Sequence, residues 1–222
     1  MELILQCMTL GNQIPMQSRR SFRSLTRLAA VILSIAVQLY GQHVLPPGVS
    51  EVRPPLKKPY ATTPLLPEYK NEPAIYITNP KEREIYRLRF GSDGLIYDAA
   101  GHRFDTTNAV RIDEHGVKAY LKFAMFVMDA KGDFYASNFQ EVRVFHHSSL
   151  VAGGEVAAAG ELQVIDGKLE FVNDRSGHYR GTPEFTEQAL ERLGRLLPPG
   201  TIESLREKNK ILVGEFYRKR SQ

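Results

Sequence analysis

The sequence has almost no cysteine. Its single cysteine, Cys7, lies close to the N-terminus, within residues 1–41. These residues have the features of a removable leader, so the mature chain would carry no thiol. This excludes disulfide bonds and a thiol nucleophile from residues 42–222.

The sequence also lacks an apolar run long enough to cross a bilayer, which takes about 20 residues. The apolar run at residues 28–37 is too short and follows a positive segment, an order typical of a signal peptide. We therefore predict a leader over residues 1–41, cleaved near Gly41, with Met16 as an alternative start. The exported protein would be periplasmic or secreted. In the alternative, the leader stays uncleaved and is the chain's one contact with a membrane.

Two export routes fit this leader. Residues 18–22 (SRRSF) resemble the twin-arginine signal, in which an arginine pair and a following phenylalanine are read by a receptor. Paired arginines also occur in ordinary leaders, so the general secretory route is the alternative. The sequence does not choose between the two routes.

The mature chain has little net charge of either sign. The whole sequence has 29 basic and 25 acidic residues, and residues 1–41 hold four arginines and one glutamate, which leaves 25 basic and 24 acidic side chains. The basic pI of about 9.1 is therefore mostly a property of the leader. Nucleic-acid binding needs a basic surface, so no nucleic-acid partner is predicted.

The chain divides into three predicted parts. After the leader, residues 42–73 are rich in proline, with seven prolines between residues 44 and 67. Proline restricts the backbone and removes a donor, so this stretch is predicted to be an extended tether, with a disordered arm as the alternative. Residues 74–222 are predicted to form one globular domain with one core.

The domain has the pattern of an α+β fold. Its first half predicts an antiparallel sheet built from hairpins, with extended segments at residues 74–78, 85–90, 94–97 and 142–146 and a central apolar strand at 121–128. Residues 160–165 pair with 168–172 across the turn Asp166-Gly167. Helices are predicted only afterwards, from Pro183 to about Leu197 and at residues 201–208, with a closing strand at 211–217. One or two C-terminal helices would then pack on the sheet.

Two polar clusters stand out from this pattern of core and turns. The first is residues 145–149 (FHHSS), which lead into a stretch rich in Gly and Ala, and the second is residues 176–180 (SGHYR). Histidine titrates near neutral pH, serine can attack or donate, and tyrosine combines a ring face with a hydroxyl. The predicted catalytic residues are His147, Ser149, Glu161, His178 and Tyr179. The predicted ligand-binding residues are His146, Ser148, Glu155, Ser176 and Glu215.

Each cluster also has a structural interpretation. On a strand, His146 and His147 would point to opposite faces, so at most one would enter a site. Ser176 would start a turn, and Tyr179 would be a core aromatic with its hydroxyl at the rim. The sequence leaves open whether the clusters meet around an unknown small ligand or protein target.

Familiar catalytic spacings are absent. His147 and His178 with Glu161 would be the candidate metal ligands, but no pair has metal-site spacing, so no metal is predicted. A serine hydrolase would place Ser148 or Ser149 beside His178, yet there is no Gly-x-Ser-x-Gly elbow. Hydrolysis is therefore kept as an alternative function.

The two polar clusters also carry a family resemblance. They resemble a domain at the C-terminal ends of bacterial polymorphic (Rhs-type) toxins, which implies a bacterial, effector-like protein of unassigned activity. They resemble equally the conserved region of the plant IQ-motif calmodulin-binding family. The chain has no IQ motif, so the resemblance does not imply calmodulin as a partner. Export would also separate the protein from cytosolic calmodulin. The resemblance covers about residues 90–195 and includes residues 94–101, 104–106, 125–129, 145–161 and 176–179.

A further resemblance is to one branch of the ADP-ribosyltransferases, which use NAD. His147, Tyr179 and Glu215 occur in the order of that family's His, Tyr and Glu. The resemblance implies that the His and a Ser hold NAD, the Tyr stacks on nicotinamide and the Glu polarises the ribose. The Tyr179 to Glu215 spacing is short for that family, and Glu155 or Glu161 is the alternative carboxylate.

Overall fold

The computed structural model describes residues 45–179 and 181–214. The predicted leader, residues 1–41, and the candidate site residue Glu215 lie outside the described residues. Within the described part of the chain, no helix is long and apolar enough to cross a membrane.

A five-stranded sheet forms the centre of the fold, in the order β10-β9-β8-β5-β6. Neighbouring strands are antiparallel except for the parallel pair β9–β10. All five residues of β5 are buried, as predicted for a central apolar strand. The strands are β5 (Ala124–Met128), β6 (Phe134–Ser137), β8 (Ala158–Ile165), β9 (Lys168–Asn173) and β10 (Ile211–Leu212).

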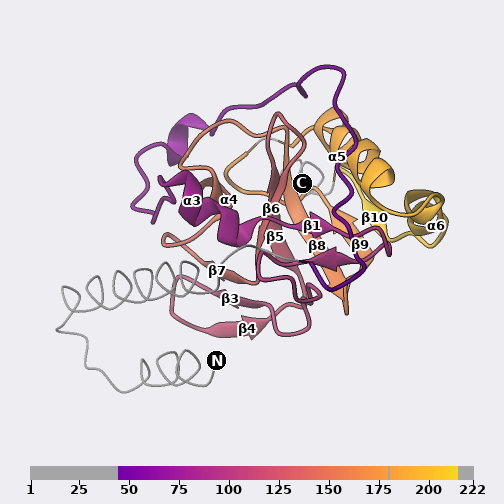
Figure 1. Cartoon of the computed structure of the whole chain (residues 1–222). Coiled ribbons are helices and arrows are strands. Elements are labelled where there is room, and N and C mark those ends of the chain that lie inside the picture. Colours follow the sequence, from indigo (N-terminus) through magenta and orange to yellow (C-terminus); the bar gives the residue numbers. More distant parts are fainter. Residues whose placement is uncertain (1–44, 180, 215–222) are drawn as a thin grey trace. The chain divides into compact units, whose positions relative to one another are not determined.

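Smaller sheets and short helices surround this centre (Figure 1). One small sheet is the antiparallel pair β1 (Arg89–Phe90) and β2 (Ile96–Tyr97). The other has the order β4-β3-β7, from β4 (Lys118–Tyr120), β3 (Val110–Ile112) and β7 (Phe139–Glu141). The α-helices are α3 (Pro80–Arg83), α4 (His147–Leu150), α5 (Pro183–Leu196) and α6 (Thr201–Glu207), and the 3₁₀ helices are η2 (Pro67–Tyr69) and η3 (Glu84–Tyr86).

Both faces of the five-stranded sheet are covered. Because side chains alternate along a strand, Phe126 and Met128 of β5 join the core on the face where α5 and α6 pack. Met125 and Val127 face the opposite core, which α4 and the segment after it help to form. Figure 1 shows α5 and α6 on one side of the sheet and α3 and α4 on the other. The predicted α+β class is confirmed.

The C-terminal helices begin where the sequence predicts. Thr182 precedes α5 in extended conformation, Pro183 occupies the first turn and Glu184 lies beside it. The hairpin β8–β9 also has the predicted turn, with φ of 47° at Asp166 and 81° at Gly167. These elements carry strong local signals, which tertiary packing does not override.

Residues 142–146 and 74–78, both predicted to be strands, differ in the structure, and residues 85–90 begin within the 3₁₀ helix η3 and reach the strand β1 only at Arg89. Residues 142–146 form a turn that leads directly into α4, and residues 74–78 are not in a strand. Single backbone hydrogen bonds hold the second segment, from Ile75 N to Val144 O and from Ile77 N to Ser149 O. Its aromatic and β-branched residues favour extended backbone, but isolated hydrogen bonds to two different segments do not form a strand ladder.

The stretch predicted to be a tether packs along the domain instead. Thr63 forms a β-bridge with Val156, and Leu65 forms one with Tyr179. Leu65 is buried in the core on the α4 side. The prolines do favour extended backbone, but apolar side chains between them dock on the domain, so residues 45–73 are part of the fold.

Gly160 of β8 gives a test of how closely the strands pack. A Cβ at this position would overlap the backbone carbonyl oxygen of Asn173 in β9. We expect Gly160→Ala to lower the free energy of unfolding by about 2–3 kcal/mol, because the strands must move apart. Urea unfolding measures the change. Gly177→Ala is the control, since a Cβ there meets no atom within 4 Å and should change stability by less than about 0.5 kcal/mol. Equal stability of the two variants would contradict the close packing.

Candidate functional site

The first polar cluster is helical rather than extended. His146 precedes α4 with φ −136° and ψ −177°, and its backbone N–H donates to Ser149 Oγ at 2.9 Å. The prediction that His146 and His147 lie on opposite faces of a strand is therefore wrong. Both histidines are buried, at the start of a helix whose residues are all buried. A four-residue helix is too short to show helical periodicity in the sequence.

The two polar clusters meet in the structure. Ser148 Oγ lies 2.8 Å from His178 Nδ1. His178 Nε2 lies 3.0 Å from an oxygen of Glu72, and His146 Nε2 lies 3.9 Å from the same oxygen. We call Glu72, His146, Ser148 and His178 the Glu72 cluster.

Aromatic contacts fix the rings of this cluster. The Tyr69 ring stacks on His178, with centroids 4.4 Å apart and planes 14° apart. The His146 and His178 rings lie 4.3 Å apart. Tyr69 is the last residue of η2, and Glu72 follows closely in the chain. One short segment therefore supplies both the ring that stacks on His178 and the carboxylate that faces it.

Both imidazoles are neutral at pH 7. Burial lowers the pKa of His146 to about 4, with smaller contributions from His178 and Arg111. Burial also lowers the pKa of His178 to about 4, with a smaller contribution from His147. A neutral imidazole offers a nitrogen lone pair, which is the form that binds metal ions.

The cluster leaves two buried polar atoms unsatisfied. The 3.0 Å contact between His178 and Glu72 does not have hydrogen-bond geometry, so Glu72 Oε2 has no hydrogen-bond partner among the described residues. His146 Nε2 is in the same state. Buried unpaired polar atoms are costly and call for an explanation, such as an ion.

Two other predicted site residues, His147 and Ser176, form hydrogen bonds with backbone groups. His147 Nε2 lies 2.9 Å from the carbonyl oxygen of Gly160, and burial lowers the pKa of this ring to about 4. Ser176 Oγ accepts a hydrogen bond from the backbone N–H of Tyr179 at 3.4 Å. Their ring and hydroxyl are used within the protein, which is the structural interpretation of these positions.

Tyr179 lies in the core. Its side chain is 0 % exposed, and its hydroxyl donates to the carbonyl oxygen of Gly154 at 2.7 Å. Burial raises the pKa of this hydroxyl. A ring in this position offers no face to nicotinamide, so the structure lends no support to the NAD hypothesis, whose third residue, Glu215, lies outside the described residues.

The predicted carboxylates Glu161 and Glu155 accept hydrogen bonds from residues outside the Glu72 cluster. Glu161 accepts a hydrogen bond from the Asn173 side chain at 3.0 Å. Glu155 accepts one from the Thr62 hydroxyl. The carboxylate that joins the histidines is Glu72, which the sequence prediction missed because it lies in the stretch taken as a tether. No local pattern marks it, since its place depends on contacts such as Leu66 N to His178 O at 3.1 Å.

The order Ser148, His178 and Glu72 has the composition of a hydrolase triad. Ser148 is 0 % exposed, however, and a nucleophile must reach its substrate. The structure therefore brings together the residues of the hydrolase hypothesis, but around a serine that a substrate cannot reach. Three donor atoms from Glu72, His146 and His178 lie within 4.8 Å of one another, a grouping suited to a metal ion.

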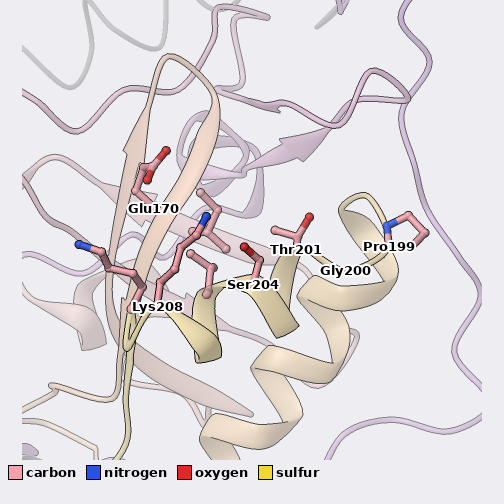
Figure 2. Close-up of a pocket in the computed structure, with 9 residues that line it drawn as sticks. Glu170, Pro199, Gly200, Thr201, Ser204 and Lys208 are labelled. Carbon is pink, nitrogen blue, oxygen red and sulfur yellow. The ribbon is translucent and has the colours of Figure 1, made fainter.

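A surface cavity of about 370 Å³ lies elsewhere, beside α6 and β9 (Figure 2). Thr201 and Ser204 come from α6, and Glu170 comes from β9. Lys208 and Lys210 also line it. Its charges are mixed, and none of the residues predicted for the site lines it.

Tyr179→Phe tests whether this tyrosine is structural. Removing the hydroxyl leaves the Gly154 carbonyl unpaired, so we expect the free energy of unfolding to fall by about 1 kcal/mol, measured by urea unfolding. Tyr120→Phe is the control, because Tyr120 is 63 % exposed. An unchanged stability of Tyr179→Phe would overturn the structural assignment.

Comparison with known proteins bears on the predicted resemblance. Residues 82–186 match the family model of the IQ motif-containing protein middle domain. IQ domain-containing protein IQM3 of Arabidopsis thaliana is 32 % identical over 116 residues, which cover 52 % of this chain and 23 % of IQM3. IQM1 of the same plant is 29 % identical over 110 residues, 50 % of this chain and 20 % of IQM1. The chain thus spans less than a quarter of the length of these relatives, and no solved structure matches it.

These relatives contradict the prediction of a bacterial, secreted, toxin-like protein, because they are plant proteins. The residues behind that prediction, at 145–161 and 176–179, are mostly buried and make core and backbone contacts. Residues buried in this way carry a shared fold and do not identify an organism. What holds is the resemblance to the plant IQ-motif family: residues 82–186 of this chain match the middle domain of those proteins.

Proposed function

We propose that this protein binds a divalent transition-metal ion through Glu72, His146 and His178. The observation that carries the proposal is that their donor atoms lie within 4.8 Å of one another while both histidines are neutral. Two imidazoles and one carboxylate are a donor set that zinc and other first-row metals accept.

The spacing of the donors suits such an ion. Bonds of about 2.0–2.1 Å in a tetrahedral site place two ligand atoms about 3.3 Å apart. Glu72 Oε2 lies 3.0 Å from His178 Nε2 and 3.9 Å from His146 Nε2, values on either side of that separation. Small side-chain shifts would therefore complete the site.

Ser148 supports the proposal through the tautomer of His178. If Nδ1 carries the proton, it donates to Ser148 Oγ, and the Nε2 lone pair faces Glu72. Two electron-pair donors facing each other repel unless a cation lies between them. A histidine that binds a metal ion through one ring nitrogen usually donates from the other to a protein group in this way.

Three protein ligands leave a coordination position for water or a ligand, as in catalytic zinc sites. The Glu72 side chain is 18 % exposed, whereas those of the two histidines are below 10 %. A ligand would therefore approach from the side of Glu72.

The comparisons with known proteins identify no partner. The names of the plant relatives refer to IQ domains, while the matched region is their middle domain. The predictions that calmodulin and nucleic acids are not partners therefore stay predictions.

Metal binding is tested by calorimetric titration of chelator-treated protein with Zn²⁺ and Co²⁺. We expect one ion per chain. Glu72→Gln, His146→Gln and His178→Gln should each weaken binding by about 100-fold or more, because each removes a direct ligand. Ser148→Ala should weaken it by about 10-fold, since it removes the hydrogen-bond partner of His178 Nδ1.

Matched controls separate the site from non-specific binding. Glu68→Gln changes an exposed carboxylate in the same segment as Glu72, and His115→Gln changes an exposed histidine. Both should bind as the unchanged protein does. Absence of saturable binding, or an equal loss in the controls and the ligand variants, would refute the metal site. Circular dichroism of each variant shows that the fold is kept.

A further inference from the structure

We infer that a second cavity, formed beneath residues 53–59, binds a small phosphate-bearing anion. This cavity has a volume of about 440 Å³ and lies between residues 53–59, the turn at residues 130–133 and Arg192 of α5. Ligand pockets commonly have volumes of about 300–1,000 Å³, so a nucleotide-sized molecule fits. The cavity shares no residue with the Glu72 cluster.

The segment that covers the cavity is restricted in conformation. Pro54, Pro55 and Pro59 restrict the backbone of the segment that covers the cavity. The segment is held to the domain by a hydrogen bond from Tyr60 N to Ala130 O at 2.9 Å. A rigid cavity loses little conformational entropy when a ligand binds.

The charge of the cavity is strongly positive. Its lining includes the cations Arg53, Lys57, Lys58, Lys131 and Arg192, with Asp133 as the one acidic residue. Asp133 is already paired with Arg53 at 2.9 Å and with Arg87 at 3.3 Å. Within the described part of the chain, the three lysines have no ion-pair partner.

Arg192 gives the cavity a built, buried cation. It is 4 % exposed, and it donates from Nε to Gly132 O at 3.2 Å and from Nη1 to Pro54 O at 2.8 Å. These bonds tie two walls of the cavity together. Burial lowers the pKa of this guanidinium, so an anion beside it would offset the cost of burial.

Phosphate is the anion that this arrangement favours. A guanidinium held in place donates to phosphate oxygens with directional bonds, and lysines add mobile charge. The cavity of Figure 2 is a weaker candidate, because Glu170 opposes its two lysines and α6 is short.

The test is calorimetric titration of the full chain with pyrophosphate and with ATP, in the presence of EDTA so that no metal ion contributes. We expect saturable binding of one anion per chain. The triple variant Lys57→Gln, Lys58→Gln, Lys131→Gln should weaken it by about 30-fold or more, because three charge-assisted contacts are lost. The lysines are exposed, so the variant should keep its fold.

A control of equal charge decides whether the cavity matters. The triple variant Lys81→Gln, Lys118→Gln, Lys168→Gln changes three exposed lysines elsewhere and should alter affinity by less than about 2-fold. Binding of both ligands assigns the affinity to phosphate, whereas binding of ATP alone shows that the nucleoside adds contacts; both support the inference. No saturable binding, or an equal loss in the two triple variants, would overturn it.

Discussion

The fold depends on the close pairing of β5 with β8. β5 carries large side chains, and β8 places small ones opposite them: Ala158 pairs with Met128, Ala159 with Val127 and Gly160 with Phe126. A sheet covered on both faces needs this difference in size, because interiors are packed at nearly constant density. The absence of a side chain at Gly160 also lets β9 approach, since a Cβ there would overlap the backbone of β9.

This pairing in turn fixes α4. The carbonyl of Gly160 is the partner of His147, so the helix is tied to the strand by a fully buried ring. Once α4 is fixed, Ser148 and His146 lie where His178 meets them. His147 thus differs from the catalytic residue expected from sequence: it positions the neighbours that form the cluster. Burial of a neutral ring with one hydrogen bond is far less costly than burial of a charged one.

Local chemistry makes the turns and the first C-terminal helix predictable from sequence. The hairpin β8–β9 follows from Asp166 and Gly167, and α5 follows from Pro183 and its apolar stripe, because turns and caps depend on neighbouring residues. Glu72 was not predictable in the same way. Its partners are more than 70 residues away in the chain, and the prolines around it suggest an extended arm whether or not that arm docks. The contact of His178 with residues 146–148 likewise depends on tertiary packing and has no local signal in the sequence.

The docking of residues 45–73 has a consequence for the matched domain. His146, Ser148 and His178 lie within residues 82–186, whereas Glu72 and Tyr69 lie before them. The matched stretch therefore supplies two donors and leaves their nitrogens facing a gap that the preceding segment fills. The segment is held independently by its own bridges and core contacts, so the carboxylate is brought to the histidines before any ion is present. An ion bound there would gain from that preorganisation, because the cost of burying Glu72 is borne by the fold and not by binding.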